Sequence, residues 1–198
     1  MLLGRRAEAL EDINKAVRIN HRHNWLGSWN AEPFPVGPEH RRVLAGLDAL
    51  LASSPRSVWA CAWRGETRVQ MGDLQGGLRD LNWALRRRRM PWAYAWRGEA
   101  LLRLGRRAQA EADLDRAVRL DPRYGRAYAF RGRLRHLQGR HAEAVTDLGR
   151  AVSDSLVEYS WLYFWRAQAH RARGRVAEAR QDAETAAWRE LHEETGVE

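Results

Sequence analysis

The chain has 198 residues, of which 44% are hydrophobic and 30% are charged, a composition that is ordinary for a folded globular protein. No stretch reaches the roughly 18 uncharged apolar residues of a membrane helix, so the sequence predicts no transmembrane span. The N-terminal residues carry charges where a secretory signal needs an apolar core, and we therefore expect a cytoplasmic protein. The single cysteine, Cys61, excludes an internal disulfide and any zinc site built from several cysteines.

The charge of the chain is strongly positive, and almost all of it comes from arginine. The formal net charge is +9, and Lys15 is the only lysine among 34 basic residues. Between Arg86 and Arg140 there are 16 arginines against five acidic residues. Such an excess indicates an anionic partner, either a nucleic acid or an acidic protein. A GC-rich genome would produce the same preference for arginine over lysine.

Four consecutive segments repeat one pattern at a spacing of 33 to 35 residues. They begin at Ala62, Ala95, Ala129 and Phe164. A glycine separates the two halves of every unit, at Gly72, Gly105, Gly139 and Gly174. Apolar residues recur at helical spacing within each half, and glycine commonly follows a helix C-terminus. Each unit is therefore predicted to be a helix, a short turn and a second helix, which must stack on its neighbours.

This pattern resembles the tetratricopeptide repeat, which has small residues at fixed offsets, a mid-repeat glycine and often a closing proline, here Pro55 and Pro122. The resemblance covers Val58 to about Leu191. It implies an all-α fold, a right-handed superhelical solenoid of helix-turn-helix repeats. The full repeats are expected over residues 58–90, 91–124, 125–159 and 160–198.

The pattern extends towards the N-terminus in an incomplete form. Residues 1–23 match a second helix alone and predict a half repeat. Residues 24–57 predict a degenerate repeat, in which an extended strap rich in proline and tryptophan replaces the first helix and one helix follows over 39–54. A chain that begins in the middle of a unit favours a piece of a longer array.

An arginine in the first helix of each full unit precedes an aspartate in the second helix by 16 residues. The four pairs are Arg64–Asp80, Arg97–Asp113, Arg131–Asp147 and Arg166–Asp182. A pair that recurs in every structural unit indicates an ion pair between the two helices rather than a catalytic or ligand site.

Two aromatic columns lie four residues apart on the first helices, and hence on one helix face. The first column is Trp59, Trp92, Arg126 and Trp161, and the second is Trp63, Trp96, Phe130 and Trp165. In the family that the chain resembles, the first helices line a concave surface on which partner peptides lie. The resemblance therefore makes the two columns, with Arg133 and Arg171, candidate partner-binding residues. Alternatively the rings fill gaps between units, and we expect the first column to be the more exposed.

The sequence predicts no catalysis, metal site or cofactor. Residues 189–197 match half of the Nudix hydrolase motif, but Arg175 and Gln181 stand where that motif needs glycine and glutamate. We therefore expect a non-catalytic scaffold that binds a protein or peptide, including an acidic one, and that can self-associate through exposed terminal helices. Two alternatives stay open: an arginine-rich helical-repeat nucleic-acid binder, and a docking fragment of a larger enzyme.

Overall fold

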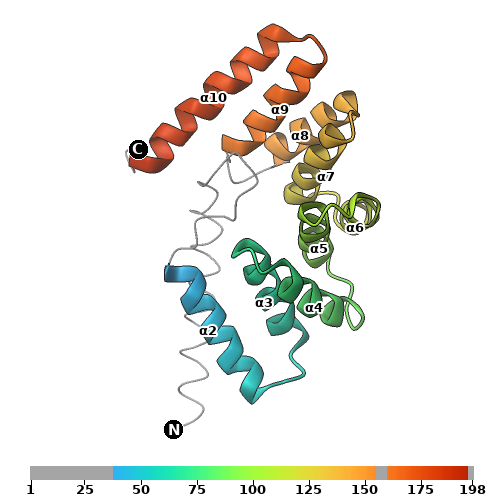
Figure 1. Cartoon of the computed structure of the whole chain (residues 1–198), viewed down its shortest axis with the longest axis vertical. Coiled ribbons are helices and arrows are strands. Elements are labelled where there is room, and N and C mark those ends of the chain that lie inside the picture. The colour runs from blue at the N-terminus through green and yellow to red at the C-terminus, as the bar shows by residue number, and fades with distance from the viewer. Residues whose placement is uncertain (1–37, 155–159, 196–198) are drawn as a thin grey trace. The chain divides into compact units, whose positions relative to one another are not determined.

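The computed structural model describes residues 38–154 and 160–195 and places them in helices joined by short turns (Figure 1). The predicted half repeat and nearly all of the predicted strap lie outside these residues. The helices of the described ranges are α2 (Pro38–Ser53), α3 (Val58–Gln70), α4 (Leu74–Leu85), α5 (Pro91–Arg103), α6 (Arg107–Leu120), α7 (Gly125–Leu137), α8 (His141–Asp154), α9 (Ser160–Ala172) and α10 (Val176–Thr195). None of these helices combines the length and the apolarity that a membrane span requires.

The chain divides into two compact units. The N-terminal unit ends at Arg89 and contains α2, α3 and α4, and the C-terminal unit begins at Met90 and contains α5 to α10. In the N-terminal unit α3 pairs with α4, and α2 packs against α3. In the C-terminal unit the pairs are α5 with α6, α7 with α8 and α9 with α10, and α7 also contacts α5 and α9. The all-α helical-repeat fold that the sequence predicts is thus confirmed.

Glycine serves both the turn and the contact between paired helices. Gly105 has φ +73°, a left-handed conformation that side chains disfavour, and the next N–H, of Arg106, donates to the carbonyl of Leu101. The other mid-repeat glycines, Gly72, Gly139 and Gly174, share this conformation. Inside α5, a Cβ atom on Gly98 would lie 2.8 Å from Cγ of Leu114 in α6. The absence of a side chain therefore sets how closely the two helices approach.

The helix of the degenerate repeat, α2, is amphipathic and supplies much of the core of the N-terminal unit. Its side chains Val43, Leu47 and Leu51 recur every four residues and are buried. They form one cluster with Ala60 and Cys61 of α3. Burying an aliphatic side chain of this size contributes about 1.5–3 kcal/mol. This cluster is what holds α2 against the first full repeat.

Candidate functional site

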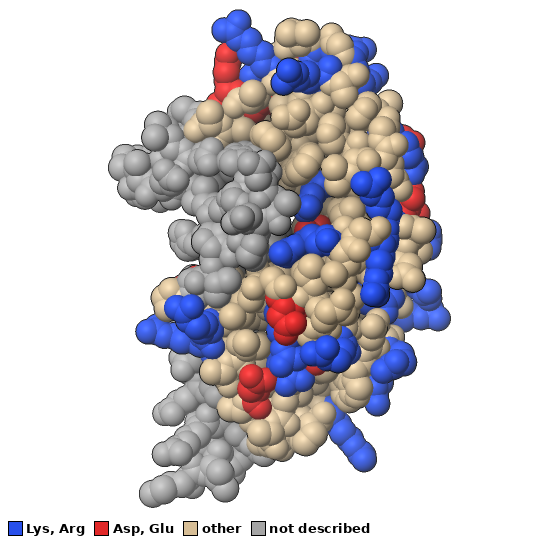
Figure 2. All heavy atoms as spheres, viewed as in Figure 1, with Lys and Arg blue, Asp and Glu red and all other residues tan. Residues whose placement is uncertain are grey.

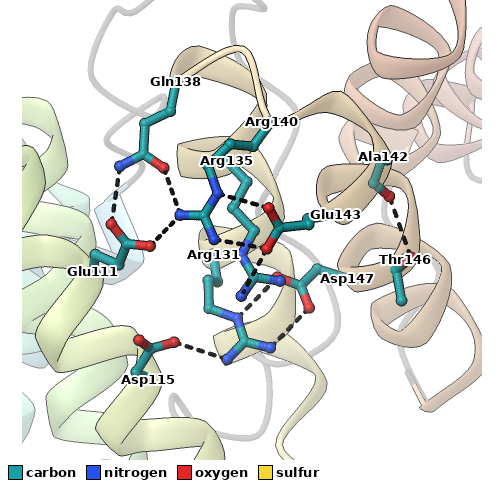
Figure 3. Close-up of polar contacts among 10 residues, drawn as sticks. All are labelled: Glu111, Asp115, Arg131, Arg135, Gln138, Arg140, Ala142, Glu143, Thr146 and Asp147. Atoms are coloured by element: carbon teal, nitrogen blue, oxygen red, sulfur yellow. Dashed lines mark hydrogen bonds and ion pairs between the residues drawn. The ribbon is translucent and has the colours of Figure 1, made fainter. Parts of the chain in front are cut away.

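Each full repeat joins its two helices through an arginine fork. Arg131 of α7 donates from Nε and Nη2 to the two carboxylate oxygens of Asp147 in α8, each at 2.8 Å, and from Nη1 to Asp115 in α6 at 2.9 Å (Figure 3). Burial alone would lower the pKa of Arg131, but its bonds to the two aspartates raise that pKa overall. The same fork joins Arg64–Asp80, Arg97–Asp113 and Arg166–Asp182. The eight side chains therefore connect helices.

Three of the four aspartates face a second basic side chain, one turn further along the first helix. These second partners are Arg68 for Asp80, Arg135 for Asp147 and, at 4.0 Å, His170 for Asp182. At the corresponding position after Arg97 stands Leu101. Arg97 is consequently the only cation within ion-pair distance of Asp113 among the described residues.

A further polar network, drawn in Figure 3, connects successive repeats. The carboxylate of Glu111 in α6 accepts a hydrogen bond from Gln138 at 3.0 Å and another from Arg140. Arg140 also donates to Glu143 of α8 at 2.8 Å and 2.6 Å. The bonds from Gln138 and Arg140 lower the pKa of Glu111. This network ties α6 to the turn between α7 and α8.

The aromatic columns are divided between core and surface. Trp96 packs edge-on against Phe130 with ring centroids 5.3 Å apart, and Phe130 stacks on Trp161 at 6.2 Å. Trp96, Phe130 and Trp161 are 0%, 1% and 9% exposed. In the N-terminal unit Trp59 is 39% exposed, and its ring centroid lies 6.1 Å from that of Trp63. Rings of one sequence column therefore differ widely in exposure.

The expectation that the first column is the more exposed is wrong for Trp161, because α7 presents the ring of Phe130 to it. Trp96 and Phe130 are likewise too deeply buried to contact a partner directly. Trp92, Arg126 and Trp165 remain half-buried. Of the candidate residues in the C-terminal unit, these three with Arg133 and Arg171 retain exposed surface.

A buried carboxylate anchors the arginine at the centre of this face. Nη1 of Arg133 in α7 donates to Oε1 of Glu99 in α5 at 2.8 Å, and Glu99 is 0% exposed. The same guanidinium lies over the ring of Trp165 in α9, 5.5 Å from its centroid. Oε2 of Glu99 and Nε of Arg133 are buried and have no hydrogen-bond partner among the described residues. Buried polar atoms are rarely left unsatisfied, so these two are a cost of burying this pair.

Sequence reasoning did not select Glu99 as a site residue, because a glutamate on a helix face is normally exposed. The available signal was its position, one repeat before Arg133 in the same column. Burial and the charge of Arg133 lower the pKa of nearby Arg103, and the charge of Glu99 opposes this shift. One carboxylate and two guanidiniums thus meet on the first helices of adjacent repeats.

Two histidines meet at the turn between α7 and α8. The Nδ1 atoms of His136 and His141 lie 3.2 Å apart, and His136 also packs edge-on against Trp165. Burial, and then the charge of His141, lowers the pKa of His136. No pattern in the sequence indicated this pair. The pair therefore places two titratable side chains beside Trp165 of α9.

The described residues place Cys61 in the core and gather no metal-binding cluster. Cys61 is buried, and its burial together with the charge of Asp80 raises its pKa to about 11, so its thiol is protonated at neutral pH. No cluster of three or more His, Cys, Asp or Glu side chains able to hold a metal occurs in residues 38–154 and 160–187. Figure 2 shows basic side chains spread over the face in view.

Comparison with known families identifies the repeats. Two family models of the tetratricopeptide repeat match residues 97–155 and 160–184. Residues 97–155 and 160–184 are tetratricopeptide repeats, as their sequence pattern indicates. No curated protein is significantly similar to it in sequence.

Solved structures of tetratricopeptide repeat proteins share this fold. TTC0263, a thermophilic protein of Thermus thermophilus, has a TM-score of 0.71 and 20% identity over 94% of this chain and 95% of its own. MamA has a TM-score of 0.62 and 19% identity over 80% of this chain and 92% of its own. YrrB, described as having an unusual peptide-binding site, has a TM-score of 0.56 and 19% identity over 75% of this chain and 76% of its own. At these identities the likeness concerns the fold alone.

Proposed function

We propose that the chain is a non-catalytic scaffold that binds a protein or peptide through its C-terminal unit. The binding surface is the face of α5, α7 and α9 that carries Trp92, Arg126, Arg133, Trp165 and Arg171, which we call the first-helix face. The observation that carries this proposal is the guanidinium of Arg133, which the buried carboxylate of Glu99 holds over the ring of Trp165. A guanidinium donates to the carbonyl and carboxylate oxygens that a peptide carries. Arginine and tryptophan are also the residues that most often dominate the energy of protein interfaces.

The charge of this face favours an acidic partner. Glu99 is the only acidic residue on α5, α7 and α9, and it is buried and bonded to Arg133. Arg126 is half-buried and Arg171 is exposed on the same helices. Opposite charge on a partner would steer it to this face and fix its register. YrrB, whose description refers to a peptide-binding site, supports the assignment by analogy of fold.

The proposal is tested by comparing two matched double variants in capture experiments from native cell extract. Arg126→Ala with Arg171→Ala alters the first-helix face, and Arg116→Ala with Arg119→Ala alters α6. Each pair removes two charges, and each removes one guanidinium that lies over a ring, Trp96 or Tyr94. We expect the first variant to lose the proteins that the parent chain captures and the second to retain them.

Equal loss from both variants would contradict a site on the first helices. Nucleic acid, the alternative that the arginine content raises, is separated by treating the extract with nuclease and by raising the salt concentration. A captured protein that depends on the first-helix face survives nuclease, whereas binding through phosphates weakens steeply with salt. Capture that nuclease abolishes would replace the proposal with the nucleic-acid alternative.

A further inference from the structure

An arginine run closes the N-terminal unit and lies against two of its tryptophans. Residues 86–89 are four consecutive arginines that follow α4, and all four are exposed. The guanidinium of Arg87 lies 3.8 Å from the ring centroid of Trp83, and that of Arg88 lies 4.8 Å from that of Trp59. Trp83 packs against the same core cluster as Trp63, whose ring lies beside that of Trp59, and we therefore treat the two guanidinium–indole contacts as one surface. We call the four arginines with Trp59 and Trp83 the Arg–Trp surface.

This surface has excess positive charge within its own unit. Among the described residues, no carboxylate lies within ion-pair distance of any of the four arginines, whereas Asp48 and Asp80 of the same unit are engaged by Arg64. A guanidinium that lies over an indole ring keeps the N–H donors at its edge available for carboxylates. The ring also restricts the motion of the side chain, so less entropy is lost when an anion binds.

The ring contacts favour carboxylates over nucleobases. Single-stranded nucleic acids bind to aromatic side chains by stacking bases on their faces. Here Arg88 lies over the ring of Trp59, which also has Trp63 at 6.1 Å, and Arg87 lies over the ring of Trp83. The ring faces that a base would use therefore carry neighbours, whereas guanidiniums are donors suited to carboxylate oxygens.

We propose that the Arg–Trp surface is a second docking site, which takes an acidic peptide segment of a partner protein. Glutamate or aspartate side chains of the segment pair with the guanidiniums of Arg86 to Arg89, and the exposed part of Trp59 covers its apolar portion. This site lies in the N-terminal unit and shares no residue with the Glu99–Arg133 site. Its test therefore stands apart from that of the proposed function.

The test uses the full chain and a fluorescein-labelled decaglutamate peptide, with binding followed by fluorescence anisotropy at about 0.15 M salt. Arg87→Gln with Arg88→Gln is compared with Arg41→Gln with Arg42→Gln, two adjacent exposed arginines of α2 that give the same change of charge. We expect the first variant to weaken binding about tenfold and the control to weaken it less than about twofold. Arg86→Gln with Arg89→Gln should also weaken binding about tenfold while leaving both ring contacts in place.

Equal weakening by the test variants and the α2 control would overturn the proposal, because binding would then follow net charge alone. Failure of the parent chain to bind the peptide would also overturn it. The second probe is a labelled oligothymidylate of ten nucleotides. Tighter binding of this probe than of decaglutamate, lost in the Arg87→Gln and Arg88→Gln variant, would assign the surface to nucleic acid and reject an acidic peptide.

Discussion

In the N-terminal unit an indole ring of the first aromatic column, Trp59, lies at the surface beneath an arginine, whereas in the C-terminal unit Trp161 of that column is buried against Phe130. The difference follows from the neighbours. In the C-terminal unit α7 contacts α5 and α9, the first helices of the two adjacent repeats. The ring of Phe130 in α7 packs against Trp96 of α5 and Trp161 of α9. In the N-terminal unit α3 contacts no first helix among the described residues: besides its partner α4 it contacts α2, whose apolar cluster has Trp63 and Trp83 packed against it. A repeated position therefore acquires its role from the adjacent repeat.

The largest expected effect is the truncation of a buried ring. Trp161→Ala removes the ring of the first column that stacks on Phe130 and should lower the free energy of unfolding by about 3–5 kcal/mol. The matched change in the N-terminal unit, Trp59→Ala, should lower it by about 1 kcal/mol or less, because that ring is partly exposed. Urea denaturation of both variants and the parent measures the difference. Similar losses would show that the two units bury their aromatic columns alike.

A second comparison concerns the arginine forks. Arg97→Ala leaves Asp113 buried without a cation among the described residues, and we expect it to cost about 3–5 kcal/mol of stability. Arg64→Ala in the N-terminal unit leaves Asp80 in contact with Arg68 and should cost about 1–3 kcal/mol.

Urea or thermal denaturation measures this difference, with Arg97→Lys as the control that keeps the charge but loses the fork. The lysine variant should fall between the parent and Arg97→Ala. If Arg64→Ala were as damaging as Arg97→Ala, Arg68 would not be compensating.

A smaller effect is expected from acidification of the C-terminal unit. Burial, with the charge of His141, lowers the pKa of His136, and burial lowers that of His170. The unfolded chain therefore binds more protons than the folded chain as the pH falls below about 6.5. The contribution of these histidines to stability is complete above that pH and is lost as the pH falls towards their lower folded pKa values.

The measurement is the free energy of unfolding in urea at about pH 7.5 and about pH 5.5. We expect the parent to lose stability on acidification and His136→Gln to lose less of its own. An identical loss in the two proteins would place the pH response outside the His136–His141 contact.

The repeat period was enough to establish the helix pairs, the mid-repeat turns and the arginine–aspartate partners. These features depend on spacings inside one helical hairpin, where a separation of 16 residues brings Arg131 and Asp147 together in any repeat of this length. Glycine at the turn, as in Gly105, is equally a local requirement of the backbone conformation. Short-range geometry of this kind is encoded in neighbouring positions of the chain.

Packing between repeats settled what the pattern left open. The burial of Glu99 and its bond to Arg133 depend on a residue 34 positions away, and the burial of Trp161 depends on a ring from the preceding repeat. A single column contains both buried and exposed members, so no periodicity within the sequence distinguishes them. Exposure is a property of the contact between helices, and only the positions of both partners in space define it.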